Sequence, residues 1–197
     1  MLILASQSPS RRAMLSAAGV PHQAMAAGVD EESAKQALRA EGVGARELAD
    51  ALAELKAIKL SRRHAADLVL GCDSTVLLDD GCMLDKAASR DEQRDLLRAI
   101  SGQRHRLFSA AVICEGGAVV WRHIDVANMY VRTLSDPFIN AYLDAEWPSI
   151  SGCVGGYRIE GPGIQLFSRV EGSHFTIQGL PLLPLLDYLR TRAVIAA

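Results

Sequence analysis

The sequence predicts an α/β fold in which a mixed, partly antiparallel sheet is flanked by helices. Strand-like and helical stretches both occur along the 197 residues, but without the regular alternation of a doubly wound parallel sheet. A long hairpin pattern over 107–133 adds antiparallel strands. The composition, 49% hydrophobic and 22% charged, is that of a globular protein. The length suits one large domain or two small lobes that share a cleft.

Capping residues and periodicity define the elements of the first half. Residues 2–5 form an apolar strand, and Ser8-Pro9 begins a helix that ends at Gly19. Helical periodicity follows over 33–64, with an interruption near two glycines, and its second half places leucines and an isoleucine on one face. Two strands, 68–70 and 75–78, precede a turn at 79–81.

The second half begins with a helical pattern at 91–100. The hairpin then comprises strands 107–114 and 119–133 around a Gly116-Gly117 turn. Another helix is expected at 136–146. A glycine-rich strand segment, 155–172, leads to a closing helix at 182–192.

Charge and cysteine usage exclude several classes of function. A net charge of −2 gives no overall attraction to a nucleic-acid polymer. The four cysteines form no C-x-x-C pair, which indicates reduced thiols and a cytoplasmic location. The Leu- and Pro-rich stretch 180–189 is too short to cross a bilayer, so we expect no membrane association. Nothing pairs the histidines with a nucleophile, and we interpret all five as structural or solvent-facing.

The segment Ser6 to Arg12 combines a strand end, a capped helix start and two adjacent arginines. Exposed N–H groups and the helix dipole favour an anion there, and arginine forks match phosphate oxygens two at a time. An ordinary strand–helix turn with solvated arginines explains the segment equally well when it is taken alone.

Asp73 follows the apolar run 68–70 within Gly71-Cys72-Asp73-Ser74. A carboxylate at the end of a buried strand could bind a hard cation such as Mg²⁺ or take a proton from water. The alternative is a turn aspartate that bonds its own backbone. Lys56 and Lys86 are candidate phosphate contacts, although solvated lysines are common. Glu31 could bind a metal or belong to a charged helix start.

Taken in order, these segments resemble the Maf family of nucleotide pyrophosphatases over essentially the whole chain. The family's opening pattern L-A-S-x-S-P-R-R is met with one extra residue before the arginine pair. Leu4 to Arg12 form this match, and the further matching elements are Gly71 to Ser74, Asp85-Lys86, Ser101 to His105 and Gly179 to Leu182.

The resemblance implies hydrolysis of nucleoside triphosphates to monophosphate and pyrophosphate by one Maf-like domain over residues 1–197. It implies that Asp73 activates water, and that Glu31 and Asp73 hold a divalent cation, Mg²⁺ or Mn²⁺. The residues that would hold the triphosphate are Ser6, Arg11, Arg12, Lys56 and Lys86. It also implies a fold of two lobes around a cleft and a homodimer.

Three positions are associated with base choice in this family, and here they are Ser10, Ser74 and Glu160. The dTTP/UTP branch resembles Y-G-I-Q-G where this chain has Tyr157-Arg158-Ile159-Glu160-Gly161. An ionised glutamate offers only acceptors, which suit the N1–H and N2–H₂ donors of guanine. The sequence therefore favours guanine-type or 7-methylguanine nucleotides. Ser10 and Ser74 match neither branch, and Ala87 replaces a usual proline.

Two other functions agree with part of the sequence. A catalytically silent nucleotide-binding regulator of cell division would be expected to lack Asp73 or the lysines, which are present. A phosphatase that releases orthophosphate fits the cations but not the ordered set of motifs.

Overall fold

The computed structural model describes residues 1–196 and contains a six-stranded sheet with the order β2-β1-β3-β4-β5-β6. Strand β1 pairs in parallel with both β2 and β3, whereas β5 and β6 are antiparallel. The predicted α/β fold with a mixed, helix-flanked sheet is therefore confirmed.

The chain divides into two compact units. Unit 1 comprises Met1–Ser74, Phe108–Asp125 and Gly179–Ala197, and unit 2 comprises Thr75–Leu107 and Val126–Gln178. Three strands contribute residues to both units: β3 (Leu68–Leu78), β4 (Arg104–Glu115) and β5 (Ala118–Val131). Each unit is described in turn.

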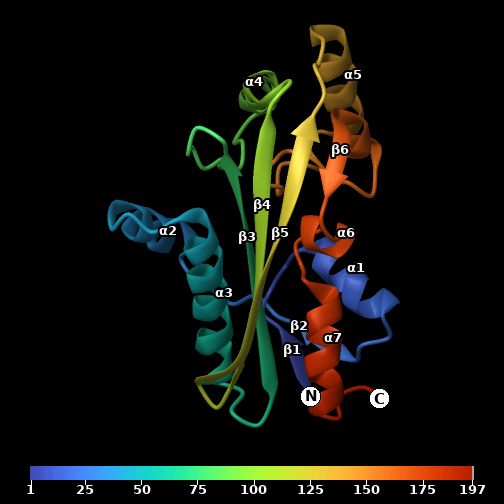
Figure 1. Cartoon of the computed structure of the whole chain (residues 1–197). Coiled ribbons are helices and arrows are strands. Elements are labelled where there is room, and N and C mark those ends of the chain that lie inside the picture. The colour runs from blue at the N-terminus through green and yellow to red at the C-terminus, as the bar shows by residue number, and fades with distance from the viewer. Residues whose placement is uncertain (197) are drawn as a thin grey trace. The chain divides into compact units, whose positions relative to one another are not determined.

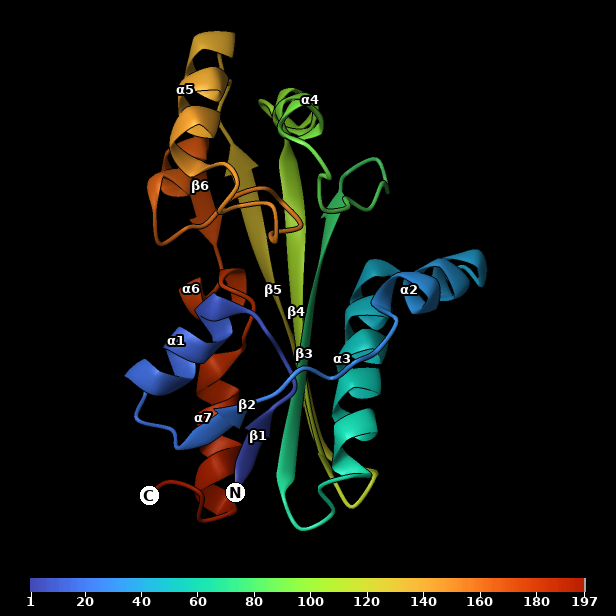
Figure 2. The ribbon, with the colours of Figure 1, turned by 180° about the vertical axis from the view of Figure 1, so that it is seen from behind.

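Unit 1 places helices on both sides of its strands. Its remaining elements are β1 (Leu2–Leu4), α1 (Pro9–Ala17), β2 (His22–Ala24), α2 (Glu31–Ala40), α3 (Ala45–Ser61) and α7 (Leu182–Thr191). Helices α3 and α7 lie on opposite sides of the strands in both views (Figure 1, Figure 2). Apolar side chains of β1, β3 and α3 pack together, among them Ile3, Val69 and Leu60. As predicted, Ser8 caps α1 and Pro9 occupies its first turn.

Strand β3 differs from the sequence prediction, which divided it into 68–70 and 75–78. It is one strand of 11 residues, and Gly71 to Ser74 lie inside it. Asp73 is therefore a strand residue and not a residue that follows a strand end. The backbone continues because Gly71 has no side chain and packs directly against the backbone of α3.

Unit 2 is built around one apolar cluster on its part of the sheet. Its own elements are α4 (Arg90–Ile100), α5 (Asp136–Glu146), the 3₁₀ helix η1 (Pro162–Leu166), β6 (Phe167–Glu171) and α6 (His174–Ile177). The fully buried side chains of Leu97, Met129 and Leu143 bring together α4, β5 and α5.

The predicted glycine-rich strand over 155–172 is wrong for most of its length. Turns and η1 occupy the segment up to Leu166, and only Phe167–Glu171 is a strand. Gly156 has a φ of +67°, which an extended strand does not allow. Pro162 lacks the N–H that a strand partner would require.

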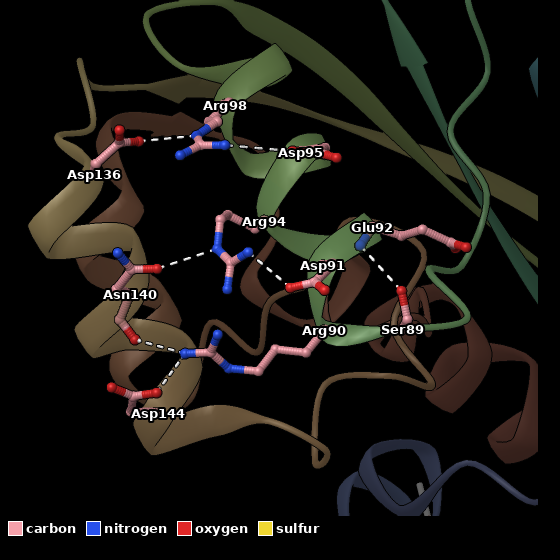
Figure 3. Close-up of polar contacts among 10 residues, drawn as sticks. All are labelled: Ser89, Arg90, Asp91, Glu92, Arg94, Asp95, Arg98, Asp136, Asn140 and Asp144. Atoms are coloured by element: carbon pink, nitrogen blue, oxygen red, sulfur yellow. Dashed lines mark hydrogen bonds and ion pairs between the residues drawn. The ribbon is translucent and has the colours of Figure 1, made fainter.

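Helices α4 and α5 face each other through a row of exposed polar contacts (Figure 3). Three arginines at four-residue spacing on α4 meet side chains at four-residue spacing on α5: Arg90 pairs with Asp144, Arg94 donates to Asn140, and Arg98 pairs with Asp136. Each exposed contact contributes at most about 1 kcal/mol. The row therefore fixes the alignment of the two helices more than it adds stability.

His105 is fully buried in unit 2, where its Nε2 lies 2.8 Å from the hydroxyl of Tyr157. It belongs to β4, and its burial agrees with the structural role expected for the histidines. Burial lowers the pKa of His105 to about 4, and Asp79 acts in the opposite direction. The folded chain therefore keeps His105 neutral at pH values at which the unfolded chain binds a proton there.

We expect the contribution of neutral His105 to the free energy of unfolding to be complete above pH 6.5. It should be lost as the pH falls from 6.5 to about 4. In that range the unfolded chain binds a proton at this residue and the folded chain does not. At pH 5 the loss amounts to about 2 kcal/mol relative to pH 7. Urea unfolding of the wild type and of His105→Gln at both values measures it, because the variant lacks this part of the decrease. The exposed His174, replaced in the same way, serves as the control; equal decreases in the wild type and His105→Gln would contradict the prediction.

Candidate functional site

The turn between β1 and α1 carries the first group of predicted site residues. Ser6, 9% exposed, accepts a hydrogen bond from the N–H of Ser8 through its Oγ at 3.2 Å. Ser8 in turn accepts from the N–H of Arg11 and so caps α1. The N-terminus of α1 carries partial positive charge next to this turn, which is favourable for an anion.

Arg11 and Arg12 lie in different surroundings. The guanidinium of Arg11 is half-buried and donates to oxygens of the protein: Ser6 Oγ, Cys72 O, Ser74 Oγ and Gly179 O. Arg12 is exposed and lines a hollow of about 280 Å³ together with Ser6, Gln7 and residues 24–26.

A second group joins α2, α3 and β3 within unit 1. The ammonium of Lys56, a residue only 5% exposed, lies 2.7 Å from Glu31 Oε2 and 2.6 Å from Asp73 Oδ1. The absence of a side chain at Gly71 lets α3 approach β3 closely enough for this contact. The structure therefore brings together three residues that are spread along the sequence from position 31 to position 73.

Two carboxylates meet at Lys56, and carboxylate oxygens are the ligands that Mg²⁺ prefers. Among residues 1–196 no group of three or more His, Cys, Asp or Glu could hold a metal ion. A Mg²⁺ bound by one or two carboxylates takes its other ligands from water and substrate phosphates. Glu31 and Asp73 fit that pattern, in which the protein supplies only part of the coordination shell.

Two of the three predicted base-choice residues lie in unit 1. Ser74 is next to Asp73 on β3, and its Oγ accepts from Arg11 and lies 2.8 Å from Ser109 Oγ. Ser109 is fully buried. Ser10 is half-buried in the first turn of α1.

The third residue, Glu160, is exposed in unit 2, as is Lys86. Both act on the thiol of Cys153, whose pKa is raised mainly by burial and further by Glu160. Arg158 and Lys86 oppose that increase. Burial is thus the main cause of the raised pKa of this thiol, and the nearby charges act on it in both directions.

Sequence reasoning gave no role to the ion pair that supports the turn preceding Glu160. Arg158 donates through Nε and Nη2 to Oε2 of Glu146, at 3.2 and 2.8 Å. The side chain of Glu146 is only 6% exposed, and this pairing raises the pKa of Arg158. A signal was present in the sequence, because Glu146 occupies the last turn of a helix, where an acidic residue opposes the helix dipole and requires a partner.

The described chain contains no helix that is both long and apolar enough to span a membrane.

Comparison with known families shows which family the chain belongs to. A family model described as "Maf-like protein" matches residues 1–192. The chain belongs to the Maf family. Among its Maf relatives, proteins named nucleoside triphosphate pyrophosphatase are 53% identical over 189 residues in Sphingopyxis alaskensis and 47% identical over 191 residues in Roseobacter denitrificans.

These Maf relatives match almost end to end. The alignment covers 96% of this chain and 96% of the Sphingopyxis protein, and the values for the Roseobacter protein are 97% and 96%. A solved structure described as a HAM1 protein from Coxiella burnetii is similar with a TM-score of 0.52. That similarity covers 95% of this chain and 98% of the other at 14% identity, and it therefore concerns the fold alone.

Proposed function

We propose that this Maf protein hydrolyses nucleoside triphosphates to nucleoside monophosphate and pyrophosphate. The observation that carries the proposal is that Lys56 contacts both Asp73 and Glu31, in the same unit as the hollow lined by Ser6 and Arg12. The names of the relatives with 45–53% identity support the same reaction class.

In the proposed reaction, Asp73 accepts a proton from water as the water oxygen bonds to the α-phosphorus. The bond between that phosphorus and the bridging oxygen breaks, and the oxygen leaves with pyrophosphate. Lys56 donates to Oδ1 of Asp73, and we assign Oδ2 as the oxygen that receives the proton. Such a hydrolysis depends on an oriented water and on charge neutralisation more than on covalent chemistry.

We further propose that the reaction uses a divalent cation held by Glu31 and Asp73. The ion, when bound, would neutralise charge on the phosphates. Ser6, Arg12 and the N-terminus of α1 would bind phosphate oxygens in unit 1. Lys86 is proposed as a phosphate contact in unit 2.

We propose guanine-type nucleotides, including 7-methyl-GTP, as preferred substrates. The support is the exposed Glu160 next to a turn that Arg158 and Glu146 hold in place. A carboxylate accepts from N1–H and N2–H₂ of guanine, whereas uracil and thymine present one donor and one acceptor.

Turnover of a panel of nucleotides with Mg²⁺ or Mn²⁺ tests the proposed reaction and the proposed preference for guanine. We expect monophosphate and pyrophosphate as the products and a higher kcat/KM for GTP or 7-methyl-GTP than for UTP and dTTP. Glu160→Gln should reduce that preference about tenfold, because the amide can also pair with a pyrimidine edge. Orthophosphate as the product would indicate a phosphatase, and nucleotide binding without turnover would indicate a regulator. Much faster turnover of UTP or dTTP than of GTP and 7-methyl-GTP would contradict the guanine preference but not the proposed hydrolysis.

A further inference from the structure

We propose that Arg11 is a positioning residue for the strand segment that carries Asp73, and that Arg12 is the arginine of the pair that contacts the polyphosphate. This division of roles rests on the proposed function and refines it, since the resemblance to the family implied that both arginines bind substrate.

The hydrogen bonds of Arg11 leave little of its guanidinium for a ligand. Nε donates to Gly179 O at 2.8 Å, Nη1 donates to Cys72 O at 3.0 Å and Ser6 Oγ at 3.3 Å, and Nη2 donates to Ser74 Oγ at 3.1 Å. Four of the five N–H groups of a guanidinium are thus in use. A bidentate contact with phosphate requires two N–H groups side by side, and Arg11 has only one that is not bonded.

Two of the acceptors of Arg11 flank Asp73 in sequence. Cys72 contributes its carbonyl oxygen and Ser74 its hydroxyl, so the guanidinium spans the residue between them. Side chains alternate across a strand. Ser74 meets Arg11 of α1, whereas Asp73 meets Lys56 of α3. Arg11 therefore holds the backbone of β3 from the side opposite to the carboxylate.

Gly179 completes the arrangement from the C-terminal part of the chain. Its carbonyl oxygen accepts from Arg11, and its φ of +99° favours glycine. A Cβ at this position would lie 3.2 Å from Nε and 3.3 Å from Nη2 of Arg11. Such contacts are tighter than ordinary packing and would displace the guanidinium. The closing glycine therefore provides space for Arg11 without contributing a side chain to any ligand.

Arg12 has the opposite character. Successive residues of an α-helix point about 100° apart, so adjacent arginines need not share a target. Arg12 is exposed and lines the hollow that also contains Ser6 and Met25. Within residues 1–196 its guanidinium has no hydrogen-bond partner, and all its donors remain for a ligand.

Five single substitutions in the full-length chain separate the two roles: Arg11→Met, Arg11→Lys, Arg12→Met, Ser74→Ala and Gly179→Ala. Turnover of the best nucleotide gives kcat and KM. Calorimetric titration with inorganic pyrophosphate and Mg²⁺ gives the affinity for the phosphate chain without any chemical step. Circular dichroism establishes that each variant is folded.

We expect Arg11→Met to lower kcat about a hundredfold and to change pyrophosphate affinity less than twofold, because small displacements of a reacting group have large effects on rate. Arg11→Lys should not restore kcat, since an ammonium cannot reach four acceptors in the plane of a guanidinium. Gly179→Ala should lower kcat in the same way, and Ser74→Ala should do so to a smaller extent. Arg12→Met should weaken pyrophosphate binding about tenfold or more.

Equal losses of pyrophosphate affinity in Arg11→Met and Arg12→Met would overturn the proposal, as would recovery of kcat in Arg11→Lys. If Arg11→Met does not fold, Ser74→Ala decides the question, because it removes an acceptor without adding bulk; an unchanged kcat in it would overturn the proposal. A wild-type chain that releases no pyrophosphate from any nucleotide would contradict the proposed function. The calorimetric comparison of Arg11→Met with Arg12→Met would still test the division of roles.

Discussion

Asp73→Asn is expected to reduce the rate of pyrophosphate release about a thousandfold, within the range that removal of a general base produces. The amide has the shape of the carboxylate, and its oxygen can still accept from Lys56, but it cannot accept the proton of the attacking water. Initial rates of pyrophosphate formation with the preferred nucleotide measure the effect, and circular dichroism tests whether the fold is retained.

The matched control is Asp67→Asn. Asp67 lies just before β3 and pairs with the N-terminal amine at 3.1 Å. Its replacement removes an acid near the same strand but not from the group around Lys56, so the rate should be unchanged. A folded Asp73→Asn protein with near wild-type turnover would exclude Asp73 as the base.

Gly71→Ala is expected to cause the largest loss of stability among single-methyl additions in unit 1. The new Cβ would overlap the carbonyl oxygen of Ala53 and lie 2.8 Å from the amide nitrogen of Ala57. Both are backbone atoms of α3, so no side chain can rotate away and the helix itself must move. We expect the free energy of unfolding to fall by about 3 kcal/mol, the upper part of the usual range for overpacking. Urea unfolding at pH 7 measures it.

Gly152→Ala is the control for Gly71→Ala. A Cβ at Gly152 would have no neighbour within 4 Å, and the free energy of unfolding should change by less than about 0.5 kcal/mol. Movement of α3 would also move Lys56, so Gly71→Ala should lose activity as well as stability. Equal stabilities of the two variants would show that α3 and β3 are not packed as closely as the structure indicates.

Local signals in the sequence were sufficient for the longer helices, but not for η1 or for the four-residue α6. Ser8 and Pro9 correctly mark the start of α1, and the predicted helix 136–146 coincides with α5. Capping and periodicity depend on neighbouring residues, which a single sequence displays directly. The prediction failed where glycine had two interpretations: Gly71 suggested a break in a strand that is continuous, and the 155–172 segment suggested a strand where turns form. Glycine serves both close packing and turns, and only the tertiary partner distinguishes them.

The residues of the site were easier to name than to arrange. Sequence reasoning selected Glu31, Lys56 and Asp73, and the structure joins them in one contact group. It also treated Arg11 and Arg12 as equivalent, because adjacency in sequence carries no information about which side chain will be enclosed. The acceptors of Arg11 come from positions 6, 72, 74 and 179, and this set becomes visible only after folding.

The bridge formed by Lys56 has a consequence for the state of the site before any substrate arrives. Two like-charged carboxylates close together repel each other unless a cation lies between them. Here the chain supplies its own counter-ion, and the formal charges of Glu31, Lys56 and Asp73 sum to −1. The two acids are thus assembled by folding alone. The entropic cost of bringing them together is met by folding, which is the meaning of preorganisation for the proposed site.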